Sequence, residues 1–430
     1  MEIIRFPHRK RWQQIIQRPL LRFEVIREAI IPILQAVRRE GDSAIKRYTM
    51  LFDKVNIKSL RVSNKEIELA KQQVKESLKR AIKVAYDNIF IFHDSQKEQV
   101  KIITTTPGVI CWRKSVPIEK VGLYVPGGTS PLFSTVLMLG IPAKIAGCSQ
   151  VILCTPPDQT GKIHPAILYT SKLVGINQIF KVGGAQAIAA MAYGSKTIPA
   201  VYKIFGPGNQ YVTAAKQLVS QEGVAIDIPA GPSEVLVVAD QTADPEFIAA
   251  DLLSQAEHGS DSQVLLITDD DKLLPAVQAA VDRQLAVLPR FDLANASLES
   301  CKLILVHDLV EILDFVNAYA PEHLILMVKD PESIAENVIN AGSVFLGKYT
   351  PESAGDYASG TNHTLPTNGF AMAYSGVSID SFVKKITFQH ISAKGLKRIG
   401  PVIEKMAEAE ELMAHKEAVR IRLNQINNKE

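Results

Sequence analysis

Apolar positions along the chain follow two different periods, and the change comes with the short polar stretch ITTTPGVICWRKSVPI (103–118). Before it, from about 23 to 92, apolar residues recur at helical spacing, as in VIREAIIPILQAVRREG, which predicts a helical N-terminal region. After it, short β-branched runs alternate with segments of helical period, as in parallel β/α units. The runs that predict strands are KVGLYV (120–125), QVILCT (150–155), QIFKV (178–182), AVYKIF (200–205), SEVLVVA (233–239), SQVLLIT (262–268), CKLILV (301–306), HLILMV (323–328) and GSVFLG (342–347).

These units fall into two series, so the sequence predicts an α/β fold. We expect two doubly wound Rossmann-like modules with an N-terminal helical region and a small helical C-terminal domain. The predicted domains are an N-terminal helical arm (1–22), a first α/β domain (23–123 and 235–378), a second α/β domain (124–234) and a C-terminal helical domain (379–430).

Composition narrows the class of partner. The 48 basic residues nearly balance the 45 acidic ones, and a net charge of +3 favours neither nucleic acid nor an anionic membrane as a partner. No apolar run approaches the roughly 18 residues of a membrane span, and the N-terminus lacks the apolar core of a signal peptide. The four cysteines form no CxxC pair, which is typical of a reducing cytoplasm. We therefore expect a cytoplasmic protein that acts on a small molecule.

The stretch SQAEH (254–258) ends an amphipathic run just before a glycine. On a helix, positions i and i+3 share a face, so Gln255 and His258 can reach one metal ion. A polar last turn before a glycine cap explains the same letters, and the pattern alone leaves both interpretations open. Glu257 points elsewhere on the helix and is expected at the surface.

A segment of about 28 residues (349–376), rich in Gly, Ser, Thr, Asn and Pro, is long enough to be a functional loop. It contains Asp356, which suits either a metal ligand or an Asx turn, and His363, which competes for any role there. His415 has the character of an ordinary helix-face histidine.

Two further patterns carry chemistry. In YAPEHLIL, Glu322 and His323 stand at the entry to a predicted strand, and a carboxylate beside an imidazole offers two proton acceptors of different basicity. Glycines follow several predicted strands, where open α/β sheets bind ligands, but GPGNQY (206–211) lacks the third glycine of a dinucleotide fingerprint. Nicotinamide binding therefore stays open on pattern alone.

Seven blocks, in order from about residue 113, closely resemble the histidinol dehydrogenase family. They are VGLYVPGGTSPLFSTVLMLGIPAKIAG, FKVGGAQAIAA, KIFGPGNQYV, DIPAGPSEVLV, DLLSQAEHGSDSQV, APEHL and AGSVFLGKYTPESAGDYASGTNHTLPT. The helical first hundred residues carry no comparable block.

The resemblance implies an enzyme of histidine biosynthesis that oxidises L-histidinol through L-histidinaldehyde to L-histidine, with one Zn²⁺ per subunit and two NAD⁺ used in succession. It implies a homodimer with a shared active site, to which the C-terminal domain contributes. The implied metal ligands are Gln255, His258, Asp356 and, from the other subunit, His415. The implied proton acceptors are Glu322 and His323. The implied substrate contacts are Ser233, Gln255, His258, His323, Asp356, Glu410 and His415. The implied NAD⁺ contacts are Tyr124, Gln186 and Asn209.

Glu410 and His415 are five residues apart, so on a continuous helix their directions differ by roughly 140°. Both can face one substrate only if the helix breaks or begins near Met413. We therefore predict such a break.

Three alternatives remain at this point. A zinc-dependent hydrolase of a small amino-acid-like substrate can use the same ligands to activate water. An aldehyde dehydrogenase mechanism can use the thiol of Cys148 or Cys154, although both flank an apolar run that favours burial. A metal site can also staple a dimer without any catalysis.

Overall fold

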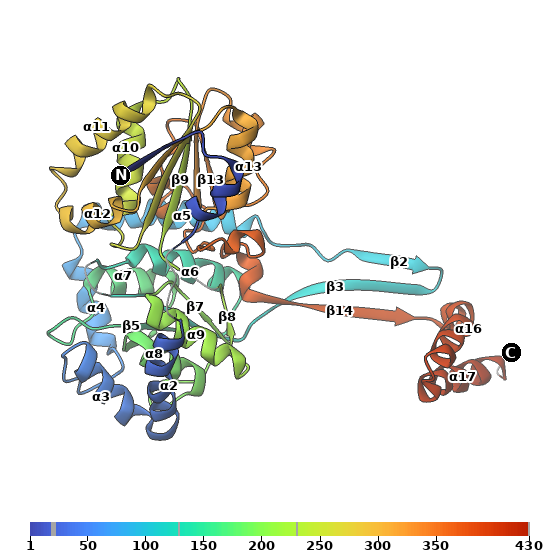
Figure 1. The fold of residues 1–430 in the computed structure, drawn as a ribbon. Coiled ribbons are helices and arrows are strands. Elements are labelled where there is room, and N and C mark those ends of the chain that lie inside the picture. Colours follow the sequence, from blue (N-terminus) through green and yellow to red (C-terminus); the bar gives the residue numbers. More distant parts are fainter. Residues whose placement is uncertain (19–22, 128–129, 229–230, 429–430) are drawn as a thin grey trace. The chain divides into compact units, whose positions relative to one another are not determined.

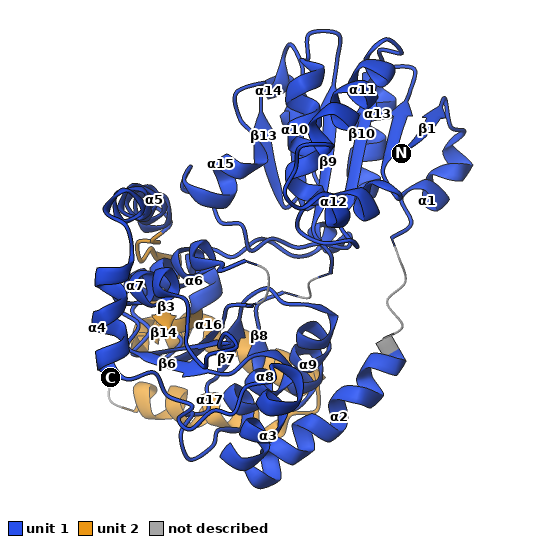
Figure 2. Ribbon diagram, turned by 90° about the vertical axis from the view of Figure 1, so that its left-hand side faces the viewer, with its two compact units in different colours: residues 1–96, 118–382 blue, residues 97–117, 383–430 orange. Residues whose placement is uncertain are grey.

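The computed structural model describes residues 1–18, 23–127, 130–228 and 231–428. The chain forms two compact units, one of residues 1–96 and 118–382 and one of residues 97–117 and 383–430 (Figure 2). In the described ranges, every helix falls short of the length and apolar character needed to cross a membrane.

The first unit contains a five-stranded parallel sheet with the order β6-β5-β4-β7-β8. Its strands are β4 (Lys120–Tyr124), β5 (Gln150–Thr155), β6 (Gln178–Lys181), β7 (Lys203–Phe205) and β8 (Ala225–Ile226). The helices that connect them are α6 (Phe133–Ala146), α7 (Pro165–Val174), α8 (Gly184–Tyr193) and α9 (Gln210–Gln221). Helix α6 is apolar all round and almost wholly buried, because further helices cover its outer side.

Those outer helices come from the N-terminal region. They are α2 (Phe23–Glu40), α3 (Asp42–Phe52), α4 (Asn64–Gln73) and α5 (Glu76–Asp94). Helices α2 and α3 contact α8, whereas α4 packs on α7 and α5 on α6 (Figure 1). Each face of the five-stranded sheet therefore carries two layers of helix, with one apolar core per face.

A six-stranded parallel sheet, of order β1-β11-β10-β9-β12-β13, forms the other half of the first unit. Its strands are β1 (Glu2–Arg5), β9 (Glu234–Ala239), β10 (Gln263–Thr268), β11 (Lys302–Leu305), β12 (His323–Met327) and β13 (Ser343–Leu346). One face is covered by α10 (Pro245–Ala256), α11 (Leu273–Leu285) and α12 (Phe291–Leu298). The other is covered by α1 (Trp12–Ile15), α13 (Leu309–Tyr319) and α14 (Pro331–Ala335). The short helix α15 (Glu352–Tyr357) follows β13.

The second unit is a three-stranded antiparallel sheet followed by a helix pair. Its elements are β2 (Ile102–Thr106), β3 (Val109–Pro117), β14 (Val383–Ile391), α16 (Ala393–Ala409) and α17 (Met413–Asn427). Helix α16 ends at Ala409, Glu411 has a φ of 59°, and α17 begins at Met413. The predicted break near Met413 is confirmed.

The α/β class, the parallel sheets and every predicted strand of the two series are confirmed. The grouping of segments differs from the predicted domains. Residues 2–5, expected in a helical arm, form the edge strand β1, and the helices within 23–94 pack on the sheet of 120–226 and not on that of 234–346. Within residues 97–117, β3 pairs with β14 and β2 pairs with β3, so the C-terminal unit contains a sheet as well as helices. The sequence did not predict this grouping, because the hydrophobic period identifies an element and its buried face but not the element that packs against that face.

Candidate active site at the edge of the six-stranded sheet

A cluster of polar side chains lies at the amino edge of the six-stranded sheet, where parallel strands β9 and β12 begin. Helix α10 runs back from the carboxyl end of β9, so the end of α10 returns to this edge. Gln255 lies in the last turn of α10 and His258 directly after it, with the His258 N–H donating to the Gln255 carbonyl at 3.2 Å. This helix end fits both interpretations of SQAEH, a pair of metal ligands and a polar last turn, so the residues that surround it must distinguish them.

His258, Glu352 and Asp356 each offer one ligand atom, and these atoms all lie within 4.8 Å of one another. Glu352 and Asp356 are four residues apart on α15 and therefore share a face. One imidazole nitrogen with carboxylate oxygens forms a donor set that suits Zn²⁺, and Mn²⁺ or Co²⁺ accept the same donors. The residues present therefore fit a divalent cation.

Gln255 is fully buried beside this group. With its amide nitrogen directed toward Glu352, Gln255 donates to that carboxylate, and its oxygen accepts from the Glu234 N–H at 3.1 Å. The amide orientation is assigned from these partners. Gln255 is thus brought to the cluster, with its side chain held by Glu352 and the start of β9.

His323 is buried at the first position of β12. Its Nδ1 lies 3.0 Å from the Glu234 carbonyl, and its Nε2 lies 3.7 Å from Asp356 Oδ1, too long for a hydrogen bond. Among the described residues, Nε2 has no hydrogen-bond partner. Burial lowers the pKa of His323, but the charges of Glu352 and Glu322 outweigh it and raise the pKa to about 10.

Glu322 accepts a hydrogen bond of 2.8 Å from the Glu234 N–H and is buried. Burial raises its pKa to about 8, against the opposing influence of His323. The backbone here is tightly constrained. Ala320 ends α13 with a φ of 51°, and a Cβ on Gly342 would lie 2.6 Å from the Glu322 carbonyl oxygen. Glycine is therefore required at 342 for the loop to reach the strand edge.

Sequence reasoning missed Glu352 and Asp251. Asp251 lies one turn before Gln255 on α10, and burial raises its pKa to about 7, against a hydrogen bond from the Glu352 backbone N–H. The spacing of Glu352 and Asp356, i and i+4, was a usable signal, but only if the segment was recognised as helix. Three small residues between them favoured a loop instead.

His363 does not offer its ring to the cluster. Its Nδ1 lies 3.0 Å from the Asp356 carbonyl oxygen and its Nε2 lies 3.1 Å from Thr135 Oγ1 on α6. It therefore supports the backbone of α15 from the side of the other sheet.

The remaining residues implied for substrate lie in two places. Ser233, just before β9, lines a cavity of about 230 Å³ together with His258 and Asn209. Glu410 caps α16 and His415 lies in the first turn of α17, and both belong to the second unit.

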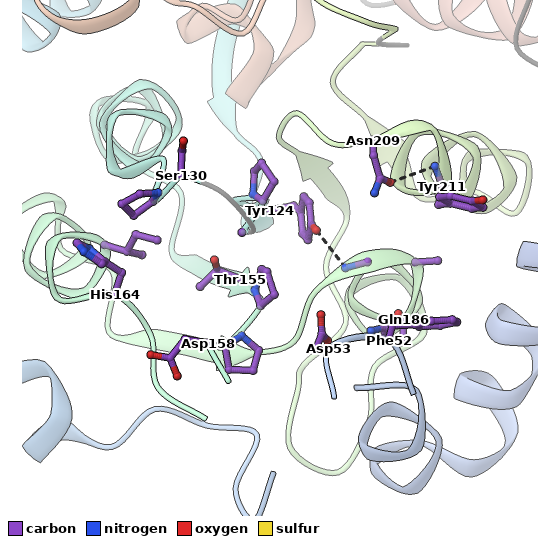
Figure 3. A pocket seen from close by; sticks show the side chains of 18 of the residues that line it. Phe52, Asp53, Tyr124, Ser130, Thr155, Asp158, His164, Gln186, Asn209 and Tyr211 are labelled. Atoms are coloured by element: carbon purple, nitrogen blue, oxygen red, sulfur yellow. Dashed lines mark hydrogen bonds between the residues drawn. The ribbon is translucent and has the colours of Figure 1, made fainter. Parts of the chain in front are cut away.

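A larger cavity, of about 1070 Å³, opens at the carboxyl edge of the five-stranded sheet (Figure 3). Tyr124, Gln186 and Asn209 all line it. The Tyr124 hydroxyl accepts from the Gly184 N–H at 3.0 Å. Asn209 caps α9 through its side-chain oxygen, and the buried Gln186 Oε1 has no partner among the described residues. The three residues implied for NAD⁺ are thus brought to one cavity.

Cys148 and Cys154, the two cysteines considered as nucleophiles, are not among the described residues that line either cavity. Burial raises the pKa of Cys148 to about 11 and that of Cys154 further, so neither is a ready thiolate.

The chain matches a family model described as histidinol dehydrogenase over residues 16–423. It is 60% identical over 424 residues to histidinol dehydrogenase of Bacteroides thetaiotaomicron, covering 99% of both chains. It is 51% identical over 428 residues to that of Yersinia pestis, covering 97% of this chain and 96% of the relative. The crystal structure of histidinol dehydrogenase from Elizabethkingia anophelis superposes with a TM-score of 0.97 at 55% identity and covers 99% of both chains.

Proposed function

The chain belongs to the histidinol dehydrogenase family, and from that membership we propose how its own residues carry out the family's reaction. The enzyme is an NAD-dependent oxidoreductase of histidine biosynthesis that oxidises L-histidinol, and the family uses zinc. The hydrolase alternative is not favoured.

Gln255, His258 and Asp356 would hold the zinc ion, with His415 of a second copy of the chain as the fourth ligand. The close approach of His258 and Asp356 within one donor group supports this assignment. When bound, the cation supplies a Lewis acid that anchors the amine and imidazole of the substrate and so orients its alcohol carbon. Glu352 lies in the same group and would offer a further carboxylate oxygen to the ion.

The observation that carries the mechanism is the unpartnered Nε2 of His323 at a buried position. A substrate hydroxyl placed there meets a proton acceptor whose other nitrogen is fixed by the Glu234 carbonyl. His323 takes the hydroxyl proton as hydride leaves the carbon for the nicotinamide. His323 accepts this proton in its neutral form, and a divalent cation held by His258 and Asp356 would favour that form by offsetting the charge of the surrounding carboxylates.

Glu322 serves the second oxidation. It takes a proton from the water that adds to the aldehyde, and the resulting hydrate gives up the second hydride. A raised pKa suits this residue, because a buried carboxylate of increased basicity is a better proton acceptor than an exposed one. Ser233 and Glu410 would contact the substrate, Glu410 from the second copy. Tyr124, Gln186 and Asn209 would contact NAD⁺ in the larger cavity.

We propose a homodimer with shared active sites. The break between α16 and α17 supports it. On one continuous helix Glu410 and His415 would point in different directions, whereas the break allows both to face one substrate. We also propose that the enzyme works in the cytoplasm. Its four cysteines are all unpaired, as expected in a reducing compartment.

The test is NADH formation from L-histidinol by the purified protein, before and after chelation and after return of zinc. We expect two NADH per histidinol, lost on chelation and restored by zinc. A hydrolase or a non-catalytic dimer gives no NADH in any arm.

The thiol alternative is tested in the same assay with Cys148→Ala and Cys154→Ala. Turnover should persist in both variants. Loss of the aldehyde step alone would restore the thiol to the mechanism.

A further inference from the structure

Asp53 stands on the wall of the larger cavity but comes from the N-terminal helices (Figure 3). It caps α3, with its N–H donating to the Thr49 carbonyl at 2.9 Å. The next residue, Lys54, has a φ of 60°, which turns the chain sharply away from the helix. The Val55 and Ile57 side chains that follow are buried in the core under α2 and α8. Asp53 is therefore held on both sides by ordered backbone.

The Oδ2 atom of Asp53 is buried and has no hydrogen-bond partner among the described residues. Burial raises the pKa of this carboxyl to about 6. A buried acceptor without a donor is costly, and a ligand that brings hydroxyl donors removes that cost. Gln186, an implied NAD⁺ contact on the same cavity, has an unpartnered Oε1 as well.

Asp158 lines the same cavity and is the obvious rival. It follows β5, the second strand of the module, where doubly wound dinucleotide folds usually carry the carboxylate for ribose. However, its Oδ1 already accepts from the Thr160 N–H and hydroxyl and from the Lys162 N–H, at 2.7–2.9 Å. Asp158 Oδ1 is thus committed to a turn, whereas Asp53 Oδ2 is buried without a hydrogen-bond partner among the described residues.

The two cavities fix the direction of the cofactor. Asn209 lines both, and the smaller one also contains His258. The nicotinamide must lie toward His258 to receive hydride, so the adenosine half remains in the larger cavity. There the half-exposed ring of Phe52 stands next to Asp53 in the chain and lines the same space, offering a surface for a base beside a carboxylate.

We propose that Asp53 accepts hydrogen bonds from the adenosine ribose hydroxyls of NAD⁺ and excludes the 2′-phosphorylated cofactor. The inference rests on the proposed function, and it names the residue that sets cofactor choice. A vicinal diol supplies two donors to one carboxylate, whereas a 2′-phosphate replaces a donor by negative charge next to it. In this enzyme the discriminating carboxylate comes from the helical N-terminal region and not from the end of the second strand.

The experiment measures binding of NAD⁺, NADP⁺ and NAD⁺ with a 2′-deoxyadenosine ribose by calorimetry, and kcat and KM for each with histidinol and zinc. Asp53→Asn and Asp53→Ser are compared with Asp158→Asn and with Asp87→Asn, an exposed carboxylate paired with Lys83 on α5. The wild type should bind the deoxy analogue and NADP⁺ at least about tenfold more weakly than NAD⁺, the loss expected for one hydrogen bond to a charged group. Both Asp53 variants should bind NAD⁺ about tenfold more weakly, with kcat at saturating NAD⁺ retained and most of the discrimination against both analogues lost.

The inference is overturned if the preference moves with Asp158→Asn and not with Asp53, or if Asp87→Asn changes it equally. Equal binding of NAD⁺ and the deoxy analogue by the wild type overturns it without any variant, so a misfolded variant does not leave it undecided. Failure of the proposed function has a different signature: the wild type forms no NADH from histidinol, while the binding measurements still report on Asp53.

Discussion

The two parallel sheets of the first unit place chemistry at opposite edges. The large cavity opens at the carboxyl edge of the five-stranded sheet, where Tyr124 ends β4 and the Gly206 turn follows β7. The polar cluster lies at the amino edge of the six-stranded sheet, before β9 and β12 begin. One topology therefore provides two kinds of site, and the general rule that ligands bind at carboxyl ends of strands describes only one of them.

The difference lies in what forms each edge. At the carboxyl edge, turns lead into helix N-termini. The turn after β7 passes so close to the end of β4 that a Cβ on Gly206 would lie 2.0 Å from the Tyr124 carbonyl oxygen. These turns border the large cavity, and the N–H groups of Gly184 and Gly206 within them donate to the Tyr124 hydroxyl and to Asp227. At the amino edge, loops enter strands and a helix ends, so N–H groups of β9 are spent on fixing side chains such as Glu322. We infer that the first edge binds and the second edge positions reactive groups.

The largest effect is expected at the amino edge. Glu322→Gln and His323→Gln should each lower kcat by about 10²–10⁴, because general bases contribute factors of that size. If their roles differ as proposed, Glu322→Gln forms close to one NADH per bound histidinol and then stalls, whereas His323→Gln slows the first hydride transfer. Rapid-mixing measurements of NADH separate the two.

The control for both is Glu336→Gln, an exposed carboxylate beyond α14 that should leave turnover unchanged. Equal kinetics for the two variants, with the same step slowed, would contradict the division of labour at this edge.

The second effect concerns the carboxyl edge. Lys216 and Asp227 form a buried ion pair, and Lys216 Nζ donates to the Gly206 carbonyl at 2.9 Å while Asp227 accepts from the Gly206 N–H at 2.7 Å. Lys216→Met leaves a buried carboxylate unpaired and should reduce the free energy of unfolding by about 3 kcal/mol, measured by urea denaturation.

The same variant should raise KM for NAD⁺ more than it lowers kcat, because Gly206 leads directly to Asn209. Lys120→Met, at a partly exposed site on β4, is the matched control. A fall in kcat with KM for NAD⁺ unchanged would mean that this edge also positions reacting groups, which removes the contrast.

A smaller effect tests what supports the amino edge. Arg18 donates to both oxygens of Glu234 at 2.5 and 2.8 Å and to the Tyr319 carbonyl at 2.8 Å, while the backbone of Glu234 holds Glu322 and His323. Arg18→Met should lower kcat by about tenfold, because Glu234 then holds Glu322 and His323 less firmly. The loss of a hydrogen bond to a charged group costs about 1.5–3 kcal/mol. The exposed pair of Arg5 with Asp271 provides the control, and Arg5→Met should change stability by less than about 0.5 kcal/mol.

The smallest effect concerns the link between the two sheets. His93 on α5 is fully buried, with Nδ1 3.1 Å from Gln96 and Nε2 3.4 Å from Asn362 Nδ2, whose amide also donates to the Met138 carbonyl at 2.6 Å. Burial lowers the pKa of His93 below its ordinary value of 6.5. The unfolded chain therefore binds a proton that the folded chain does not, and stability falls as the pH drops below 6.5.

His93→Gln should flatten the fall in the free energy of unfolding between neutral pH and the pH at which the folded imidazole titrates. His8, exposed near the N-terminus, serves as the control in His8→Gln. An unchanged acid slope in His93→Gln would show that other groups carry the pH dependence.

Much of this protein was readable from its residues. Short continuous apolar runs between helical segments identified the strands of both parallel sheets, because a strand buried on both faces is apolar along its length. The five-residue spacing of Glu410 and His415 predicted the break before Met413 from helix geometry alone. The pairing of β3 with β14 could not be predicted, because β14 is largely exposed and β3 is only partly buried, so neither has the apolar pattern of a core strand.

The residue pattern alone was enough for the class of fold and, through long matching blocks, for the family. The sequence did not reveal that the polar side chains gather at an amino edge or that Glu352 lies beside His258 and Asp356. Nor did it reveal that Asp53 reaches the wall of a cavity formed by strands far along the chain. The physical reason is that local periodicity reports only which face of an element is buried. Which surface covers that face, and which polar atoms are left without partners, depends on contacts between distant segments.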